Sequence, residues 1–303
     1  MREPTMVDLD PRSLLGEAGK LALRFGDEAY FAALCLRSGL VGIELPHRTA
    51  SMLLSFERFG LLGGAVSISA TKHGDRVALI DERGPLSYQE LDKRSNALAN
   101  AWRERGLEPG QGVAILARNH RGFLDAVFAA AKCGARIVLL NTDFAGPQIR
   151  EVAGREGTDL LVYDDEYADM LSGVDPPLGR WRAWTENTET TEDAGSTGDT
   201  LEALIEGGDT GTPRRPSRAA KVVILTSGTT GTPKGAPRQE PKSLGAIGGL
   251  LDKVPFRARE VTECCAPLFH ALGFAHALLA VAMGSTLVLR RKFDPAATLA
   301  SLE

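Results

Sequence analysis

The sequence predicts an α/β fold in which mostly parallel or mixed sheets are flanked by helices. From Arg76 onward, short runs of β-branched and apolar residues alternate with longer windows of helical periodicity. The 303 residues are 43% hydrophobic, which is enough to bury a substantial core. The first observation indicates alternating β and α units, and the second indicates a globular chain with a buried core.

The first predicted elements are a strand over 76–80 and a helix that begins after Ser87. Ser87 and Glu90 have the spacing of a capping box, and Gly106 is placed to end the helix. One face of this helix carries the apolar residues Leu91, Leu98 and Trp102.

A β-α-β-α-β progression follows. It consists of a strand over 112–117, a helix over 123–131 ended by Gly134, a strand over 136–140, a helix over 147–152 and a strand over 159–163. We expect its crossovers to be right-handed over a largely parallel sheet.

After a polar stretch, regular structure resumes near residue 219. We expect a strand over 221–226, a helix over 243–251, a strand over 261–265, a helix from Leu272 and a strand over 285–290. Asp294 and Pro295 have the pattern of an N-cap and a first-turn proline, so a last helix begins there.

These patterns divide the chain into four parts. Residues 1–70 form a helical, apolar N-terminal extension, and 71–172 form a first α/β part. Residues 173–218, rich in Pro, Gly, Thr, Asp and Glu, form a loop or linker. Residues 219–303 form a second α/β part, which we expect to be truncated at its C-terminal end.

Charge and cysteine content restrict the classes of function. A net charge of −4 gives no basic surplus for a phosphate backbone, so we expect no nucleic-acid partner. The N-terminus lacks the basic and then apolar regions of a signal peptide. Four cysteines lack metal-ligand spacing, and we expect them to be reduced thiols of a cytoplasmic protein: Cys35, Cys133, Cys264 and Cys265. We predict that the last two are buried strand residues and that the chain has no metal-ligating residues.

The N-terminal 70 residues are unusually apolar over 30–45 and 52–70. Charged residues interrupt every window that could span a membrane. Helices that pack on the main body are the favoured interpretation. A peripheral contact with membrane or lipid through residues 1–70 stays open as the alternative.

The segment with the clearest chemistry is Leu225-Thr-Ser-Gly-Thr-Thr-Gly-Thr-Pro-Lys-Gly-Ala236, directly after a predicted strand. Its glycines allow the backbone N–H groups to converge on anionic oxygens. Hydroxyl groups and one lysine add donors and a cation suited to phosphate. It is not a Walker A loop, because Pro233 precedes Lys234 and no Ser or Thr follows it. The predicted phosphate-binding residues are Thr226, Ser227, Gly228, Thr229, Thr230, Gly231, Thr232 and Lys234.

This string resembles, position for position, the phosphate loop of the adenylate-forming superfamily of acyl-CoA synthetases, peptide-synthetase adenylation domains and luciferases. Other segments agree in order: Leu86-Ser-Tyr-Gln-Glu-Leu91, the stretch from Phe123 to Asn141, and Pro267-Leu-Phe-His270 followed by Gly273. The resemblance covers about residues 70–303 and is greatest to a fatty-acid–CoA ligase. It implies the incomplete, large N-terminal domain of that fold.

The resemblance implies an ATP-dependent reaction with Mg²⁺ and coenzyme A. A carboxylic acid would form an acyl-adenylate with release of pyrophosphate, and a thiol would then displace AMP to give a thioester. Lys234 and His270 would be catalytic, and His270, Gly273 and Phe274 would line the substrate pocket. A fatty acid is favoured as the substrate, with an aryl acid as the alternative.

The family's adenine-side aromatic-Gly-x-Thr-Glu motif, ribose-binding Asp, hinge and C-terminal Lys have no counterpart in these residues. We therefore expect the chain to lack the C-terminal catalytic part. The sequence does not decide whether the 303 residues are active without that part. Two other functions stay open: a non-catalytic nucleotide-binding or regulatory relic of the fold, and a peripheral membrane scaffold. An unpaired sheet edge would favour a homo-oligomer, or a partner that supplies the missing part.

Overall fold

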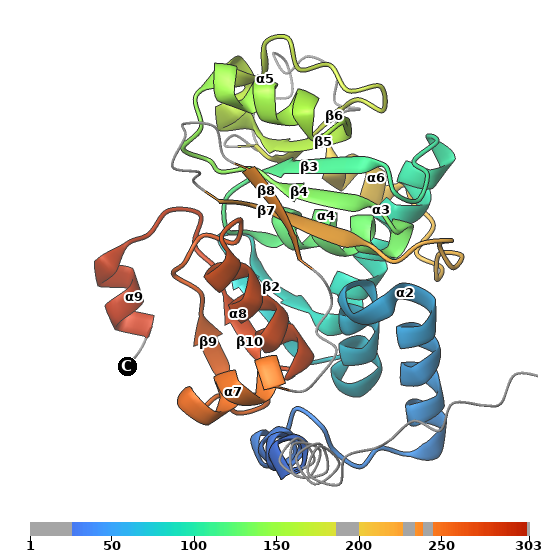
Figure 1. Cartoon of the computed structure of the whole chain (residues 1–303), viewed down its shortest axis with the longest axis vertical. Helices are drawn as coiled ribbons and strands as arrows, with labels where there is room; N and C mark the ends of the chain where they lie inside the picture. Colours follow the sequence, from blue (N-terminus) through green and yellow to red (C-terminus); the bar gives the residue numbers. More distant parts are fainter. Residues whose placement is uncertain (1–25, 186–199, 227–233, 239–244, 302–303) are drawn as a thin grey trace, which may run out of the picture. The chain divides into compact units, whose positions relative to one another are not determined.

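The computed structural model describes residues 26–185, 200–226, 234–238 and 245–301, and it divides the chain into two compact units. The small unit combines Met1–Ile43 with Glu240–Ala258. The large unit combines Glu44–Gln239 with Arg259–Glu303 and contains every strand in the described residues (Figure 1).

In the small unit, a helix over 26–38 packs against α7 (Gly245–Lys253). The Tyr30 hydroxyl donates a hydrogen bond to the Asp252 carboxylate. The Phe31 ring lies so close to Gly248 that a Cβ there would be 2.4 Å from it. A backbone hydrogen bond of 2.7 Å from Ala258 N to Ser38 O joins the ends of the unit.

The large unit contains a four-stranded sheet in the order β2-β1-β10-β9. Its strands are β1 (Val77–Asp81), β2 (Gly84–Ser87), β9 (Val261–Glu263) and β10 (Thr286–Val288). β10 pairs in parallel with both β1 and β9, and α8 (Ala271–Ala282) connects β9 to β10. Leu79 thus lies beside Leu287, although more than two hundred residues separate them in the sequence.

A six-stranded sheet follows the order β6-β5-β3-β4-β7-β8. Its strands are β3 (Gly112–Leu116), β4 (Arg136–Leu139), β5 (Thr158–Asp164), β6 (Arg180–Trp184), β7 (Lys221–Thr226) and β8 (Lys234–Arg238). All neighbours pair in parallel except β7 and β8, which form an antiparallel pair. The predicted fold class and the β-α-β-α-β progression are therefore confirmed.

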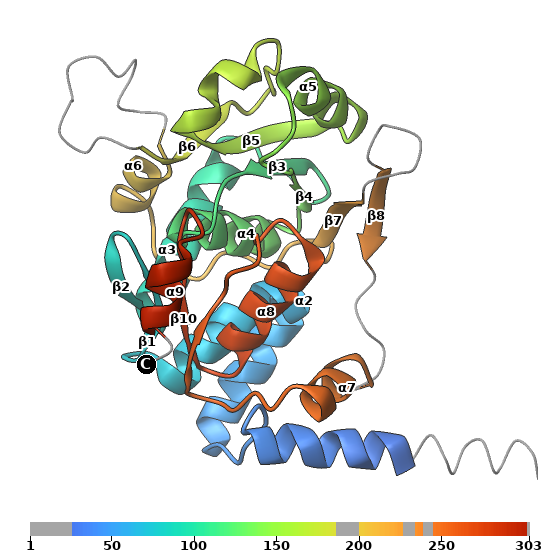
Figure 2. The same ribbon diagram turned by 90° about the vertical axis from the view of Figure 1, so that its left-hand side faces the viewer.

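Helices cover both faces of the six-stranded sheet. Figure 2 shows α4 (Arg121–Cys133) and α5 (Gly146–Arg155) on opposite sides of it. The face with α4 shares one hydrophobic cluster with α3 (Tyr88–Glu104), α8 and the four-stranded sheet. The face with α5 has a separate cluster, which includes the 3₁₀ helix η1 (Asp165–Leu171).

Local signals at the helix ends are as the sequence predicts. The Ser87 hydroxyl accepts from Glu90 N at 3.2 Å, and the Glu90 carboxylate accepts from Ser87 N at 2.7 Å, so the capping box is formed. Gly134 ends α4 with φ 71°, a left-handed conformation that costs glycine little. The Asp294 carboxylate caps α9 (Pro295–Ser301) by accepting from two backbone N–H groups.

The prediction of a loop or linker over 173–218 is wrong for two stretches. Residues Arg180–Trp184 form β6, and α6 (Leu201–Glu206) follows an N-cap bond from Ala203 N to the Thr200 hydroxyl. Both elements are short and lie in a polar sequence, so tertiary pairing with β5 and packing against α3 outweigh the local composition. Residues 186–199 lie outside the described part of the chain.

The helix α2 (Pro46–His73) crosses the boundary predicted at residue 70. It bends at Gly60, and beyond the bend Val66 and Ser69 are fully buried. The Ser69 hydroxyl donates to Val281 O at 2.7 Å, which fixes this half on α8. The expectation that charged residues interrupt every window able to span a membrane is wrong for α2, which is long and apolar enough to do so by length and composition alone. The packing of its second half agrees with a helix of the main body, and the four-part division stays a prediction.

The four cysteines are free thiols, as predicted. Cys264 is 2% exposed, but both it and Cys265 follow the last residue of β9, and Cys265 is exposed. The prediction of two buried strand residues is therefore wrong: Cys264 is buried but lies beyond β9, and Cys265 lies beyond β9 and is exposed.

We predict that the stability of the large unit falls between pH 6.5 and pH 4 in part because of His73. Burial, with a smaller effect of Lys72, lowers the pKa of His73 from 6.5 to about 4. As the pH falls through this window, the unfolded chain binds a proton that the folded chain excludes, so the free energy of unfolding decreases. Urea unfolding at pH 7 and pH 5 should show a smaller loss for His73→Gln than for the unaltered chain. Equal losses would contradict this assignment.

Candidate functional site

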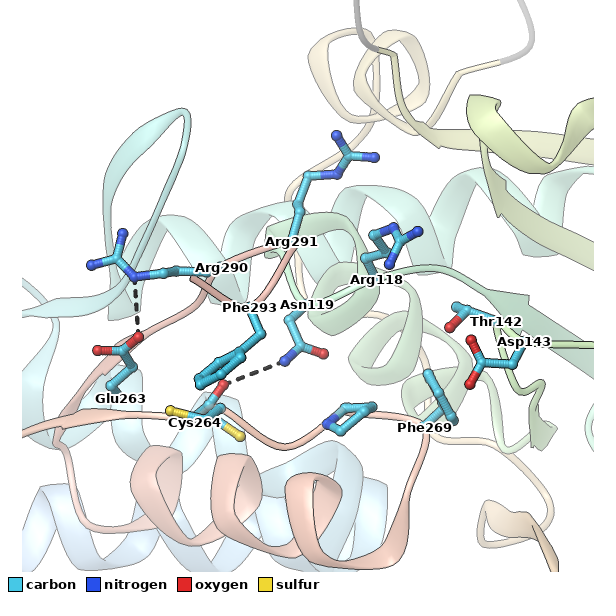
Figure 3. A pocket seen from close by; sticks show the side chains of 12 residues that line it. Arg118, Asn119, Thr142, Asp143, Glu263, Cys264, Phe269, Arg290, Arg291 and Phe293 are labelled. Carbon is cyan, nitrogen blue, oxygen red and sulfur yellow. Dashed lines mark hydrogen bonds and ion pairs between the residues drawn. The ribbon is translucent and has the colours of Figure 1, made fainter. Parts of the chain in front are cut away.

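A pocket of about 190 Å³ opens where strands of both sheets end (Figure 3). Its walls come from the segments after β3, β4, β9 and β10, and each of these strands runs parallel to its partner within its sheet. The carboxyl ends of parallel strands are the usual location of ligand sites in α/β proteins. The lining residues are Arg118, Asn119, Thr142, Asp143, Glu263, Cys264, Cys265, Pro267, Phe269, Arg290, Arg291 and Phe293.

Three arginines line the pocket, and each is held by a carboxylate. Arg118 donates two hydrogen bonds to Glu166, at 2.7 and 2.8 Å, and Arg291 donates to the same carboxylate at 2.7 Å. The hydrogen bond from Arg118 keeps the pKa of Glu166 below its ordinary value. The guanidinium groups are therefore fixed in orientation before any ligand arrives.

The third arginine, Arg290, donates to Glu263 at 3.0 Å. Burial acts to raise the pKa of Glu263, but hydrogen bonds from Ser301, Thr298 and Arg290 outweigh it and hold the pKa below its ordinary value. Glu263 thus stays charged at neutral pH and ties the end of β9 to α9.

Arg291 also reaches the indole ring of Trp184 at the end of β6. Its guanidinium carbon lies 4.9 Å from the ring centroid, and that of Arg83 lies 4.1 Å from the same ring. The His120 ring stacks at a tilt against Trp184, with centroids 4.9 Å apart. This cluster supports the pocket from the side of the six-stranded sheet.

The ends of the predicted phosphate loop lie at the same edge of the sheet as the pocket. Thr226 ends β7 and pairs in register with Lys234, the first residue of β8. β7 is the parallel neighbour of β4, whose carboxyl end leads to the pocket residues Thr142 and Asp143. The residues between the strands, predicted to bind phosphate, lie outside the described part of the chain: Ser227, Gly228, Thr229, Thr230, Gly231 and Thr232.

His270 is the N-cap residue of α8, and its side chain is exposed. Its ring lies 4.5 Å from the ring of Phe269, which lines the pocket. The structure thus places His270 next to the pocket wall. Its catalytic role, like that of Lys234, stays a prediction.

Gly273 and Phe274 do not line this pocket. A Cβ on Gly273 would lie 2.2 Å from Pro267 O, so the close approach of α8 to the preceding turn requires glycine. Phe274 is 7% exposed and belongs to the hydrophobic cluster between the sheets. The geometry gives both residues a structural place, and their assignment to a substrate pocket stays a prediction.

Sequence reasoning missed the arginines, their carboxylate partners and Trp184. Their only sequence signal is that Arg118 and Arg291 directly follow predicted strands and that Arg290 ends one of them. Among the described residues, no group of three or more His, Cys, Asp or Glu side chains could hold a metal ion.

Comparisons of this chain with a family model and with known proteins agree on one family. A family model described as AMP-binding enzyme matches residues 66–303. A feruloyl-CoA synthase from Amycolatopsis sp. is 29% identical over 238 residues, covering 78% of this chain and 43% of that protein. The long-chain-fatty-acid–CoA ligase FadD13 of Mycobacterium tuberculosis is 25% identical over 213 residues, covering 69% of this chain and 40% of that protein. The chain spans less than half the length of these two relatives.

Solved structures share the fold. The inhibitor-bound N-terminal domain of FACL13 from Mycobacterium tuberculosis superposes with a TM-score of 0.65 and 22% identity. The match covers 80% of this chain and 59% of that one.

We predict that Gly273→Ala destabilises the large unit by about 1–3 kcal/mol, because the new methyl group meets backbone oxygens that cannot move aside. The matched control is Gly154→Ala on the exposed side of α5, where a Cβ meets nothing within 4 Å. There the change should stabilise by up to roughly 1 kcal/mol. Urea unfolding of both variants provides the measurement, and equal midpoints would contradict the packing of Gly273.

Proposed function

The chain belongs to the family of AMP-binding enzymes, and from that premise we propose that it takes part in the ATP-dependent activation of a carboxylic acid. The acid forms an acyl-adenylate and then an acyl-CoA thioester. Because the chain spans less than half of its curated relatives, this activity is proposed for the whole protein to which these residues correspond.

One observation carries the proposal. The strand that leads into the Gly/Thr/Lys loop is the neighbour of β4, and β4 leads into the wall of the pocket. A nucleotide held by its phosphates at this loop would therefore have its α-phosphate near the carboxyl edge where the pocket opens. Positioning of this kind supplies much of the acceleration in phosphoryl and adenylyl transfer.

The reaction proposed has two balanced steps. A carboxylate oxygen attacks the α-phosphorus of Mg-ATP, the bond from that phosphorus to the bridging oxygen breaks, and pyrophosphate leaves. The thiolate of coenzyme A then attacks the acyl carbon, and the carbon–oxygen bond to AMP breaks. The loop N–H and hydroxyl groups, with Lys234, stabilise the negative charge on the β- and γ-phosphates.

We propose that Mg²⁺ enters the site bound to the nucleotide substrate. The described residues contain no cluster of three ligands, and Mg²⁺ commonly binds through substrate phosphates with one or two carboxylates. Its chemistry there is to neutralise charge on the phosphate oxygens. The pocket arginines already have carboxylate partners, so they orient and polarise the site rather than replace the cation.

For the acid we propose a fatty acid, with an aryl acid as the second candidate. The FadD13 relative, named as a long-chain-fatty-acid–CoA ligase, supports the first. The relative named as a feruloyl-CoA synthase supports the second. Phe269 and Phe293 in the pocket wall suit either an alkyl chain or an aromatic ring.

A membrane contact of residues 1–70 is a separate proposal. On the first half of α2, Leu53, Leu54 and Phe56 are 60%, 66% and 47% exposed. Such a face supports interfacial binding. Cosedimentation with phosphatidylcholine–phosphatidylglycerol liposomes that persists when Leu53, Leu54 and Phe56 are all replaced by Ser would contradict it, and these changes leave the buried half of α2 in place.

We predict that Lys234→Ala weakens the binding of Mg-ATP to the 303-residue chain by about 10-fold or more, because a charge-assisted contact to phosphate is lost. Isothermal titration calorimetry measures the affinity. Lys93→Ala, an exposed lysine on α3, is the matched control and should leave the affinity unchanged. Equal affinities for Lys234→Ala and the unaltered chain would contradict the role of Lys234.

A second titration distinguishes the acids. The stable analogues dodecanoyl- and feruloyl-sulfamoyl adenosine carry the same nucleotide and differ only in the acyl group. We expect the dodecanoyl compound to bind at least 10-fold more tightly, and the reverse order would favour the aryl acid. If a chain shown to be folded binds neither analogue nor Mg-ATP, these residues alone do not form the site, and the proposal fails for this chain.

A further inference from the structure

The side chain of Asn119 connects the two sheets at the pocket by hydrogen bonds. Asn119 follows β3, lines the pocket and is only 8% exposed. The amide nitrogen donates to Ala266 O at 3.0 Å and to Cys264 O at 3.3 Å, and the amide oxygen accepts from Leu268 N at 2.8 Å. All three partners belong to the segment 264–268, which follows β9 of the other sheet (Figure 3).

The chemistry of these contacts requires a carboxamide. Two carbonyl oxygens face the donor end of the group, and one N–H faces the acceptor end. A carboxylate in the same place would lose both donors and put its charge against two carbonyl oxygens. In a buried setting the loss of such partners is costly, because the backbone groups have no water to replace them.

The residues on either side of Asn119 are anchored to Asp164 at the end of β5, Arg118 by its backbone N–H and His120 by its ring. Asp164 accepts from Arg118 N at 2.9 Å with one carboxylate oxygen. The other oxygen lies 2.8 Å from His120 Nε2, which donates to it because His120 Nδ1 accepts from Gly122 N. Asp164 and His120 are both fully buried. The amide of Asn119 therefore projects from a rigid support.

The segment that Asn119 holds leads directly to His270. His270 N donates to Pro267 O at 3.0 Å, and Gly273 packs against the same carbonyl group. The His270 side chain makes no capping bond to its own helix and rests on Phe269. Its location thus depends on the backbone course of residues 264–270.

We propose that Asn119 is a positioning residue that sets where His270 lies relative to the pocket and to the phosphate-loop edge of the sheet. It acts through the segment 264–268. Only the consequence for ligand binding rests on the proposed function. The effect on the location of His270 stands on the geometry alone.

The first test measures His270 itself in the 303-residue chain. We label the five histidines with ¹³C, assign the His270 imidazole signal with His270→Gln, and follow the signal by NMR as a function of pH. In Asn119→Asp we expect the His270 signal and its titration midpoint to shift. Asn119→Ser, which replaces the carboxamide with a shorter hydroxyl group and adds no charge, should also shift the signal and guards against a folding failure of the first variant.

The matched control is Asn100→Asp. Asn100 also clamps a loop by donating to two carbonyl oxygens, those of Asp209 and Gly211, each at 2.9 Å. This clamp lies away from the pocket residues, so the control should lower the midpoint of thermal unfolding without moving the His270 signal. A merely structural role for Asn119 would give the same pattern as this control.

The second test measures binding of dodecanoyl-sulfamoyl adenosine and of Mg-ATP by calorimetry. In Asn119→Ser we expect the affinity for the acyl analogue to fall by about 10-fold while Mg-ATP binding is retained, because the phosphate loop is untouched. An unshifted His270 signal in folded Asn119→Asp and Asn119→Ser overturns the proposal. If the unaltered chain binds neither ligand, the proposed function fails, and the NMR result still decides the positioning of His270.

Discussion

The burial of α4 between the two sheets is the constraint on which the rest of the large unit depends. All thirteen residues of the helix are buried, including the charged residues Lys132 and Asp125. Charges in such a place are tolerated only with close partners. Lys132 donates to Asp92, Ser95 and Asn96 of α3, and Asp125 accepts from Arg94 of the same helix. These polar contacts fix α3 and α4 against each other, and the apolar remainder of α4 joins the cluster shared by both sheets.

The position of the pocket follows from this arrangement. Arg121, the first residue of α4, pairs with Asp81, the last residue of β1, at 2.5 Å. The start of the helix thus holds the end of a strand from the four-stranded sheet beside the end of β3 from the six-stranded sheet. Since the other parallel strands end at the same edges, side chains from four separate segments meet there, as Figure 3 shows.

Electrostatic pairing then gives the pocket its fixed walls. Asp164 ends β5, and Glu166 lies at the start of η1. Both carboxylates accept hydrogen bonds from Arg118, after β3, and form ion pairs with Arg291, after β10. Because the partners are partly or fully buried, these pairs are screened less by salt than surface pairs. A pocket of this kind is suited to bind a polar, charged ligand without first reorganising its own charges.

The sequence by itself determined the order of the β-α units, the capping of α3 by Ser87 and Glu90, the end of α4 at Gly134, and the loop that relates the chain to AMP-binding enzymes. Each of these depends on residues close together in the chain, where spacing and backbone preference act directly. Only the tertiary structure decided that β10 lies between β1 and β9, that β6 and α6 form in a polar segment, and that Asn119 faces residues 264–268. Those features join residues up to about two hundred positions apart, and the physical reason is that strand partners and buried hydrogen bonds are selected by packing, which leaves no local pattern to read.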